Sequence, residues 1–131
     1  MIHKYINSKP GCSPKQPIVQ VFSKSEMCEV GPEYCGRPFG GVCIIAKKHH
    51  LYKIHEIEVP SERGVAIGLC SNAGVLVQVI VAVYMPFYDS SNKMQTVWFT
   101  ETVDILQTLY DNYAALAPVK LFGEFNARLP G

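Results

Sequence analysis

Charged residues are scarce in this sequence and almost balanced in sign. Asp, Glu, Lys and Arg make up 18% of the chain, and the formal net charge is +1. Proteins that bind nucleic acids usually carry a basic surface, so this balance gives no support to one, although it leaves room for a local basic patch. With 48% of 131 residues apolar, the composition is typical of one globular domain and not of a disordered chain.

Long hydrophobic runs and paired cysteines are also missing. The longest apolar run, residues 74–83, is too short to cross a membrane and contains Gln78. His3 and Lys4 stand where a secretory signal would be hydrophobic, so we expect a protein of the nucleus or cytoplasm that is not secreted. Five cysteines, an odd number with no Cys-x-x-Cys pair, favour reduced thiols. They are Cys12, Cys28, Cys35, Cys43 and Cys70.

The N-terminal residues differ from the rest in their proline content. Residues 1–20 contain Pro10, Pro14 and Pro17, and we expect an extended or poorly ordered lead-in there, with residues 21–131 forming one partial domain. Glycines and prolines also make residues 26–38 loop-like.

Short apolar runs predict the strands of a sheet. They are residues 18–22, 42–46, 52–59, 65–70, 75–83 and 119–122. The run at 42–46 is apolar on both faces, which predicts a central strand covered on both sides. Asn72 and Gly74 predict a β-hairpin between the runs that flank them. Cys43 and Cys70 are expected to be small core residues.

One helix is predicted between the last two strands. It should begin near Thr96, after an N-cap within residues 89–92, and end at Ala117, ahead of Pro118. The face expected to pack on the sheet consists of Phe99, Val103, Leu106, Tyr110 and Tyr113. A strand–helix–strand order favours parallel strands, which would bring Tyr84 and Glu124 to the same edge of the sheet. The elements therefore predict an α/β protein of the α+β type, a layered sandwich with a mainly antiparallel, mixed sheet.

The end of the chain is the most informative stretch for function. Residues 119–122 run into Gly123, and Glu124 and Asn126 follow at the carboxyl end of the strand, where ligands collect in α/β proteins. A carboxylate and an amide can orient water, hold a divalent cation or bind phosphate. The same residues are also consistent with an ordinary turn.

Three segments together resemble a known family. They are Gly36-Arg-Pro-Phe-Gly-Gly41, Val83-Tyr-Met-Pro86 and Leu121-Phe-Gly-Glu-Phe-Asn-Ala127, in this order. The set resembles the endonuclease/exonuclease/phosphatase family of Mg²⁺-dependent phosphodiesterases, and most closely the endonuclease domains of non-LTR (LINE-type) retrotransposons. The resemblance covers residues 25–129. It implies a fragment of a four-layered α/β sandwich, Mg²⁺ as cofactor, DNA as partner, no membrane, and the remainder of a longer polyprotein as a further partner.

The resemblance also implies a role for individual residues. Tyr84 matches a tyrosine that contacts the scissile phosphate region, and Glu124 stands where the family has an aspartate that orients or deprotonates the attacking water. Asn126 matches an asparagine that hydrogen-bonds the phosphate and helps to hold that aspartate. Arg37 and Arg128 are the candidates for binding the substrate. The chemistry is coherent, since phosphodiester hydrolysis needs an activated water, donors to the charged phosphate and a cation.

The sequence departs from the family at three points. Glu124 is one methylene longer than the usual aspartate, and no Gln-Glu-type motif precedes residue 36, so no metal ligand is assigned. The family's later histidine has no counterpart. We therefore expect an internal piece of the domain that is inactive or nearly so, with unpaired sheet edges and an apolar face that invite pairing with another chain.

Alternative functions remain open. The chain could belong to a phosphatase of the same superfamily that acts on small phosphoesters, or be a non-catalytic relic or binding module. A zinc site of His49 and His50 with Cys35 and Cys43 fits no standard spacing.

Overall fold

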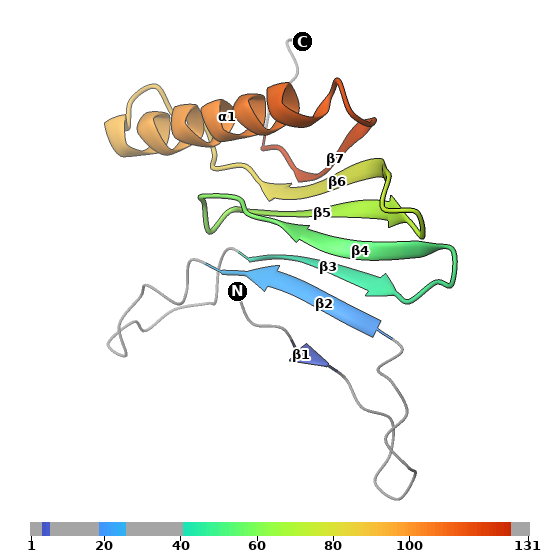
Figure 1. The fold of residues 1–131 in the computed structure, drawn as a ribbon. Coiled ribbons are helices and arrows are strands. Elements are labelled where there is room, and N and C mark those ends of the chain that lie inside the picture. The colour runs from blue at the N-terminus through green and yellow to red at the C-terminus, as the bar shows by residue number, and fades with distance from the viewer. Residues whose placement is uncertain (1–3, 6–18, 26–40, 127–131) are drawn as a thin grey trace, which may run out of the picture.

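The computed structural model describes residues 4–5, 19–25 and 41–126, which form two sheets and one helix (Figure 1). The elements are β1 (Lys4–Tyr5), β2 (Val19–Lys24), β3 (Val42–Lys47), β4 (Tyr52–Ile57), β5 (Gly64–Ser71), β6 (Leu76–Tyr84), α1 (Lys93–Tyr113) and β7 (Val119–Glu124). The antiparallel sheet has the order β1-β2-β3, and the mixed sheet has the order β4-β5-β6-β7. The predicted α+β class is confirmed.

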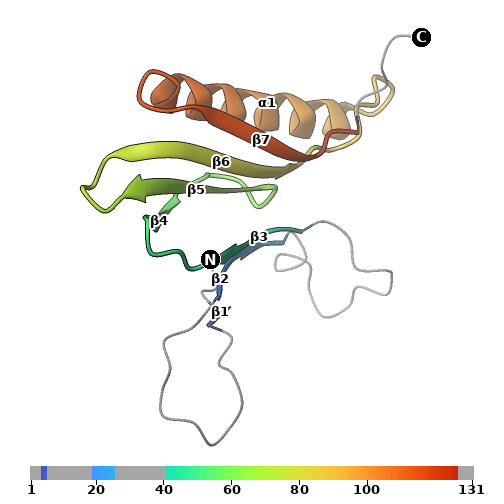
Figure 2. The ribbon, with the colours of Figure 1, turned by 90° about the vertical axis from the view of Figure 1, so that its right-hand side faces the viewer.

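The described elements form three layers. Figure 2 shows α1, the four-stranded sheet and the three-stranded sheet following one another. Side chains alternate between the faces of β6, so Val79 and Val81 pack with Leu109 of α1, while Ile80 faces the other sheet. The core between the sheets is built around Phe22, Val65 and Ile67. Apolar burial on both faces thus holds the four-stranded sheet in the middle.

A lysine ties the two sheets together at one edge. The Lys24 ammonium, at the end of β2, donates to the carbonyl oxygens of Val59 and Ser61, the second at 3.0 Å. These carbonyls belong to the connection after β4, so the contact links the end of one sheet to a loop of the other. Charged donors make stronger hydrogen bonds than neutral ones, so Lys24 adds a polar link to the apolar packing between the sheets.

The N-terminal strands begin within the predicted lead-in. Lys4 pairs with Val21 and Tyr5 with Gln20 of β2, which itself starts at Val19. The predicted loop at residues 26–38 lies outside the described residues.

The prediction that residues 42–46 form a central, doubly covered strand is wrong. The segment is a strand, but β3 is the last strand of its sheet. Val42, Ile44 and Ala46 turn toward Phe22, whereas Ile45 is 65% exposed on the other face. Cys43 is exposed too, so its predicted core position is also wrong, while Cys70 is half-buried. An apolar run shows that both faces could be covered, but only one face of this sheet meets a partner among the described residues.

The predicted hairpin of β5 and β6 is confirmed. The strands pair antiparallel, and Gly74 adopts a φ of 82° in a turn closed by its N–H donating to the Ser71 carbonyl at 2.9 Å. Strand β5 lies between β4 and β6, and its first five residues are buried. The buried residues of β6 lie in the second half of the strand. They are Val79, Val81 and Val83. The hairpin is thus the most deeply covered part of the sheet.

Helix α1 begins three residues before the predicted start. Asn92 is its N-cap, with the side-chain oxygen accepting from the N–H groups of Met94 at 3.1 Å and Gln95 at 3.4 Å. The Asp89 carboxylate accepts from the Ser91 hydroxyl and backbone N–H, which hold the pKa of Asp89 below its ordinary value. The predicted N-cap within residues 89–92 is therefore confirmed, and the residue is Asn92.

The predicted packing face of α1 is wrong for two of its five residues. Val103 and Tyr110 are 41% and 52% exposed, whereas Thr102 and Leu109 are the buried residues. The true face is turned by only part of one residue step, because Leu106 and Tyr113 stay in the core while Ile105 and Leu109 join them. Burial of a polar side chain is possible here because the Thr102 hydroxyl donates to the Trp98 carbonyl at 2.7 Å within the helix. The helix also ends at Tyr113, four residues before the predicted end.

Candidate active site

The carboxyl ends of β6 and β7 lie side by side, as the strand–helix–strand order predicts. The two strands pair in parallel, and the register places Tyr84 opposite Glu124. The Met85 N–H donates to the Glu124 carbonyl at 2.8 Å, so the pairing continues one residue beyond β6. Two residues that are forty positions apart in the sequence are therefore neighbours at one edge of the sheet.

Gly123 determines how β7 approaches β6 just before Glu124. Its φ is 149°, in a region that side chains rarely permit, and a Cβ at this position would overlap the Val83 carbonyl group. Only glycine allows β7 to lie this close to β6 at its end. The close approach in turn fixes the backbone that carries Glu124.

Asn126 is attached to the end of β6 by its side chain. It has a left-handed φ of 46°, which asparagine tolerates better than most residues. Its amide nitrogen donates to the Met85 carbonyl at 2.8 Å. An amide group has two N–H donors and an acceptor oxygen, so one donor and the oxygen remain for a ligand. The half-buried Asn126 is thus held at the same strand ends as Tyr84 and Glu124.

A hollow at this edge has lining residues that belong to all three family-like segments, the first of which contributes Gly41. It has a volume of about 330 Å³ and is open to solvent. Its lining comes from the start of β3, the end of β6 and the end of β7. These residues are Gly41, Val42, Cys43, Ala82, Val83, Tyr84, Phe122, Gly123 and Glu124. The volume lies at the lower limit of ligand-binding clefts, which is enough for a phosphodiester group and its neighbouring atoms.

The structure leaves two predicted site residues undescribed. Arg37 and Arg128 both lie outside the described residues. Among the residues the structure does describe, no group of three or more His, Cys, Asp or Glu side chains is placed to share a metal ion.

The zinc alternative does not fit the described residues. His49 and His50 stack on each other with ring centroids 4.5 Å apart, beyond the far end of β3 from Cys43. Four strand residues span more than about 10 Å, whereas a zinc ion holds its ligands at about 2.0–2.3 Å. Cys43 and His49 therefore cannot hold the same ion in this fold, and Cys35 lies outside the described part of the chain.

The sequence does not predict the backbone groups and small residues that form part of the site. The Met85 carbonyl that holds Asn126 and the Cys43 that lines the hollow carry no motif of their own. Gly123 could have been noticed, because a glycine that interrupts a strand often marks a close backbone approach. Its contact with the Val83 carbonyl depends on the register of β6 and β7, two strands that are far apart in the sequence.

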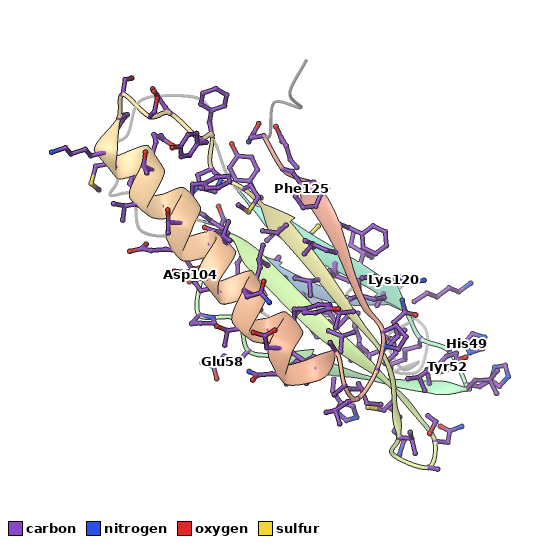
Figure 3. The ribbon with its side chains drawn as sticks, turned by 90° about the horizontal axis from the view of Figure 1, so that it is seen from above. His49, Tyr52, Glu58, Asp104, Lys120 and Phe125 are labelled. Carbon is purple, nitrogen blue, oxygen red and sulfur yellow. The ribbon has the colours of Figure 1, made fainter. Side chains whose placement is uncertain are left out.

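A second, acidic hollow lies apart from the first. It is lined by Glu56, Glu58 and Glu62 with Lys24, and it shares no residue with the hollow at Glu124. Figure 3 shows Glu58 far from Phe125, which follows the end of β7. This acidic cluster provides an internal comparison for any test of cation binding.

Comparison of the chain with family models, with curated proteins and with solved structures gives no match in any of the three. Within residues 4–5, 19–25 and 41–126, no helix has the length and apolar character needed to cross a membrane.

Proposed function

We propose that this chain carries part of a phosphodiesterase site of the endonuclease/exonuclease/phosphatase type, closest to the endonuclease domains of LINE-type retrotransposons. The ancestral reaction is Mg²⁺-dependent hydrolysis of DNA phosphodiester bonds. The 131 residues by themselves do not carry out this reaction at an appreciable rate. The observation that supports the proposal best is the meeting of Gly41, Tyr84 and Glu124, one from each family-like segment, at a single hollow.

Two residues that line the hollow, Tyr84 and Glu124, and the nearby Asn126 suit the attack of water on a phosphodiester. The Glu124 carboxylate would accept a proton from water as the water oxygen bonds to phosphorus and the bond to the leaving oxygen breaks. Donors toward the phosphate oxygens would come from the Tyr84 hydroxyl and from the Asn126 N–H that does not bond Met85. The leaving oxygen must also gain a proton, and this role has no assigned residue.

The donor set at the site is compatible with Mg²⁺ but incomplete. Mg²⁺ is commonly bound through one or two carboxylates, with water and substrate phosphate as the other ligands. Glu124 supplies a carboxylate and Asn126 an amide oxygen, both near the end of β7. When bound, the ion would neutralise charge on the phosphate.

The length of Glu124 explains why turnover is expected to be slow. The family has an aspartate here, and the added methylene moves the carboxylate by about 1 Å or more. A misplacement of this size can lower a rate about 100-fold. The side chain is exposed at the end of an edge strand, so no packing against the described part of the chain corrects its position.

Binding of DNA tests the proposal without relying on turnover. We expect a fluorescent double-stranded oligonucleotide to bind in Mg²⁺ and to bind more weakly in a chelator. Glu124→Gln, which keeps the shape of the side chain, should lower the Mg²⁺-dependent affinity about tenfold, the loss of one charge-assisted contact. The measurement is fluorescence anisotropy at fixed ionic strength, because phosphate contacts depend on salt.

Glu58→Gln is the matched control, since it removes one carboxylate from the acidic hollow instead. Equal losses in both variants, or binding that does not depend on Mg²⁺, would contradict the proposal. Nicking of supercoiled plasmid in the same mixtures, lost in Asn126→Ala, would support the site and show that the expected inactivity is wrong.

A further inference from the structure

Strand β7 has an open edge with two large apolar side chains. It is the last strand of its sheet, and no other strand among the described residues pairs with its outer side. Every residue from Lys120 to Glu124 is exposed, with Leu121 at 42% and Phe122 at 56%. Open edges of this kind are usually protected, because their unpaired N–H and C=O groups bind other strands. Neither α1 nor the second sheet protects this one.

The pairing with β6 determines which backbone groups of β7 point outward. The Val79 N–H donates to the Pro118 carbonyl at 2.9 Å, and the Met85 N–H donates to the Glu124 carbonyl. Even-numbered residues of β7 therefore bond toward β6. Backbone groups alternate in direction along a strand, so the N–H and C=O groups of Val119, Leu121 and Gly123 point to the open side.

We propose that the edge is occupied by β7 of a second copy of this chain, antiparallel, with the two-fold axis at Phe122. In this register Leu121 lies opposite Gly123 of the second copy, and both residues have outward backbone groups that can bond each other. Phe122 faces Phe122 of the second copy as a non-hydrogen-bonded pair, in which side chains lie closest. Lys120 faces Glu124 of the second copy, and Glu124 faces Lys120.

Charge complementarity selects this register among those that the backbone allows. An axis at Leu121 would place Lys120 opposite Phe122, and an axis at Gly123 would place Phe122 opposite Glu124. An axis between two residues would place each residue with outward N–H and C=O groups opposite a residue whose groups point toward β6, so the two could not bond each other. Only the axis at Phe122 satisfies both charges, and each such cross-strand pair stabilises a sheet. Neither Lys120 nor Glu124 has an ion-pair partner among the described residues. Figure 3 shows Lys120 extending outward from β7.

The pairing would join two four-stranded sheets into one continuous sheet. It would also bring the ammonium of Lys120 from the second copy to Glu124, at the rim of the hollow that contains Tyr84. A cation would then lie beside the candidate site. The pairing itself rests on the edge of β7 alone and does not depend on the proposed function.

Sedimentation of the full chain over a range of concentrations tests the proposal. Wild type should form a dimer whose dissociation constant rises about tenfold or more in Lys120→Glu and in Glu124→Lys, because each variant places like charges opposite each other twice per dimer. A mixture of the two variants should associate again, since one chain then carries carboxylates at both paired positions and the other carries ammonium groups at both. This recovery cannot come from restored folding, because neither chain changes on mixing.

Lys53→Glu is the matched control, because it makes the same charge change on β4, at the opposite edge of the sheet. It should leave the dissociation constant unchanged, and thermal melting should show that all variants are folded. A wild type that stays monomeric would overturn the proposal. So would an equal effect of Lys53→Glu, or a mixture that associates no better than its components.

Discussion

Replacing Gly123 with alanine is expected to cost more than about 3 kcal/mol of the free energy of unfolding. The new Cβ would overlap the Val83 carbonyl group, and the φ of 149° is strained for any residue with a side chain. Relief of the overlap requires β7 to move away from β6, which disrupts the pairing of Tyr84 with Glu124. The substitution should therefore affect both the stability of the sheet and the geometry of the candidate site.

Chemical denaturation measures this effect, and Gly74→Ala is its matched control. Gly74 also has a positive φ, 82°, but no atom lies within 4 Å of the position of an added Cβ. Its replacement should cost only the backbone term, about 1–2 kcal/mol. If Gly123→Ala costs no more than Gly74→Ala, the close approach of β7 to β6 is not as described.

The second large effect is expected from Phe22, the residue that joins the two sheets. It is 1% exposed and packs with Val65 and Ile67 of the four-stranded sheet. Phe22→Ala should cost about 3–5 kcal/mol, because it removes a buried ring and leaves a cavity between the layers. We expect the three-stranded sheet to lose its attachment before the hairpin of β5 and β6 unfolds.

Ile45→Ala provides the comparison for Phe22→Ala. Ile45 lies on the neighbouring strand but on the outer face, where it is 65% exposed, so its loss should change stability by less than about 1 kcal/mol. Both values come from equilibrium denaturation monitored by circular dichroism. Equal costs for the two variants would mean that the three-stranded sheet does not pack on β5 as the structure indicates.

The sequence predicted the parts of the fold that depend on chain order. The change from a strand pattern to a helix pattern after Tyr84, and back at Val119, was enough to predict parallel neighbours. The opposition of Tyr84 and Glu124 follows from this topology and needs no knowledge of side-chain contacts. The hairpin at Gly74 was predictable for a similar reason, because turn residues act locally.

The wrong predictions concern which face of a strand or helix is buried against another element. The pattern of β3 did not show that Ile45 would have no covering layer among the described residues. In α1 the apolar Val103 was expected inside, but the buried position belongs to Thr102, whose hydroxyl is satisfied within the helix. Periodicity identifies residues that can share a face, whereas packing between distant elements decides which face is buried.

The details of the candidate site were not predictable for a different reason. The position of Glu124 depends on how closely Gly123 approaches Val83, and that of Asn126 on a hydrogen bond to the Met85 carbonyl. Both contacts join segments that are about forty residues apart. Chain order predicts that Tyr84 and Glu124 lie at one edge of the sheet, but the contacts of Gly123 and Asn126 depend on the exact register of β6 and β7.

We propose that the carboxyl ends of β6 and β7 form a cation and phosphate site, and a titration with Mn²⁺ in place of Mg²⁺ locates the bound ion. Bound Mn²⁺ broadens the NMR signals of nearby backbone amides. We expect the first signals to broaden in small additions to be those of Met85, Glu124 and Asn126, and we expect this broadening to be lost in Glu124→Gln and kept in Glu58→Gln. Broadening centred instead on Glu56, Glu58 and Glu62, and unchanged in Glu124→Gln, would mean that the cation does not bind at the ends of β6 and β7.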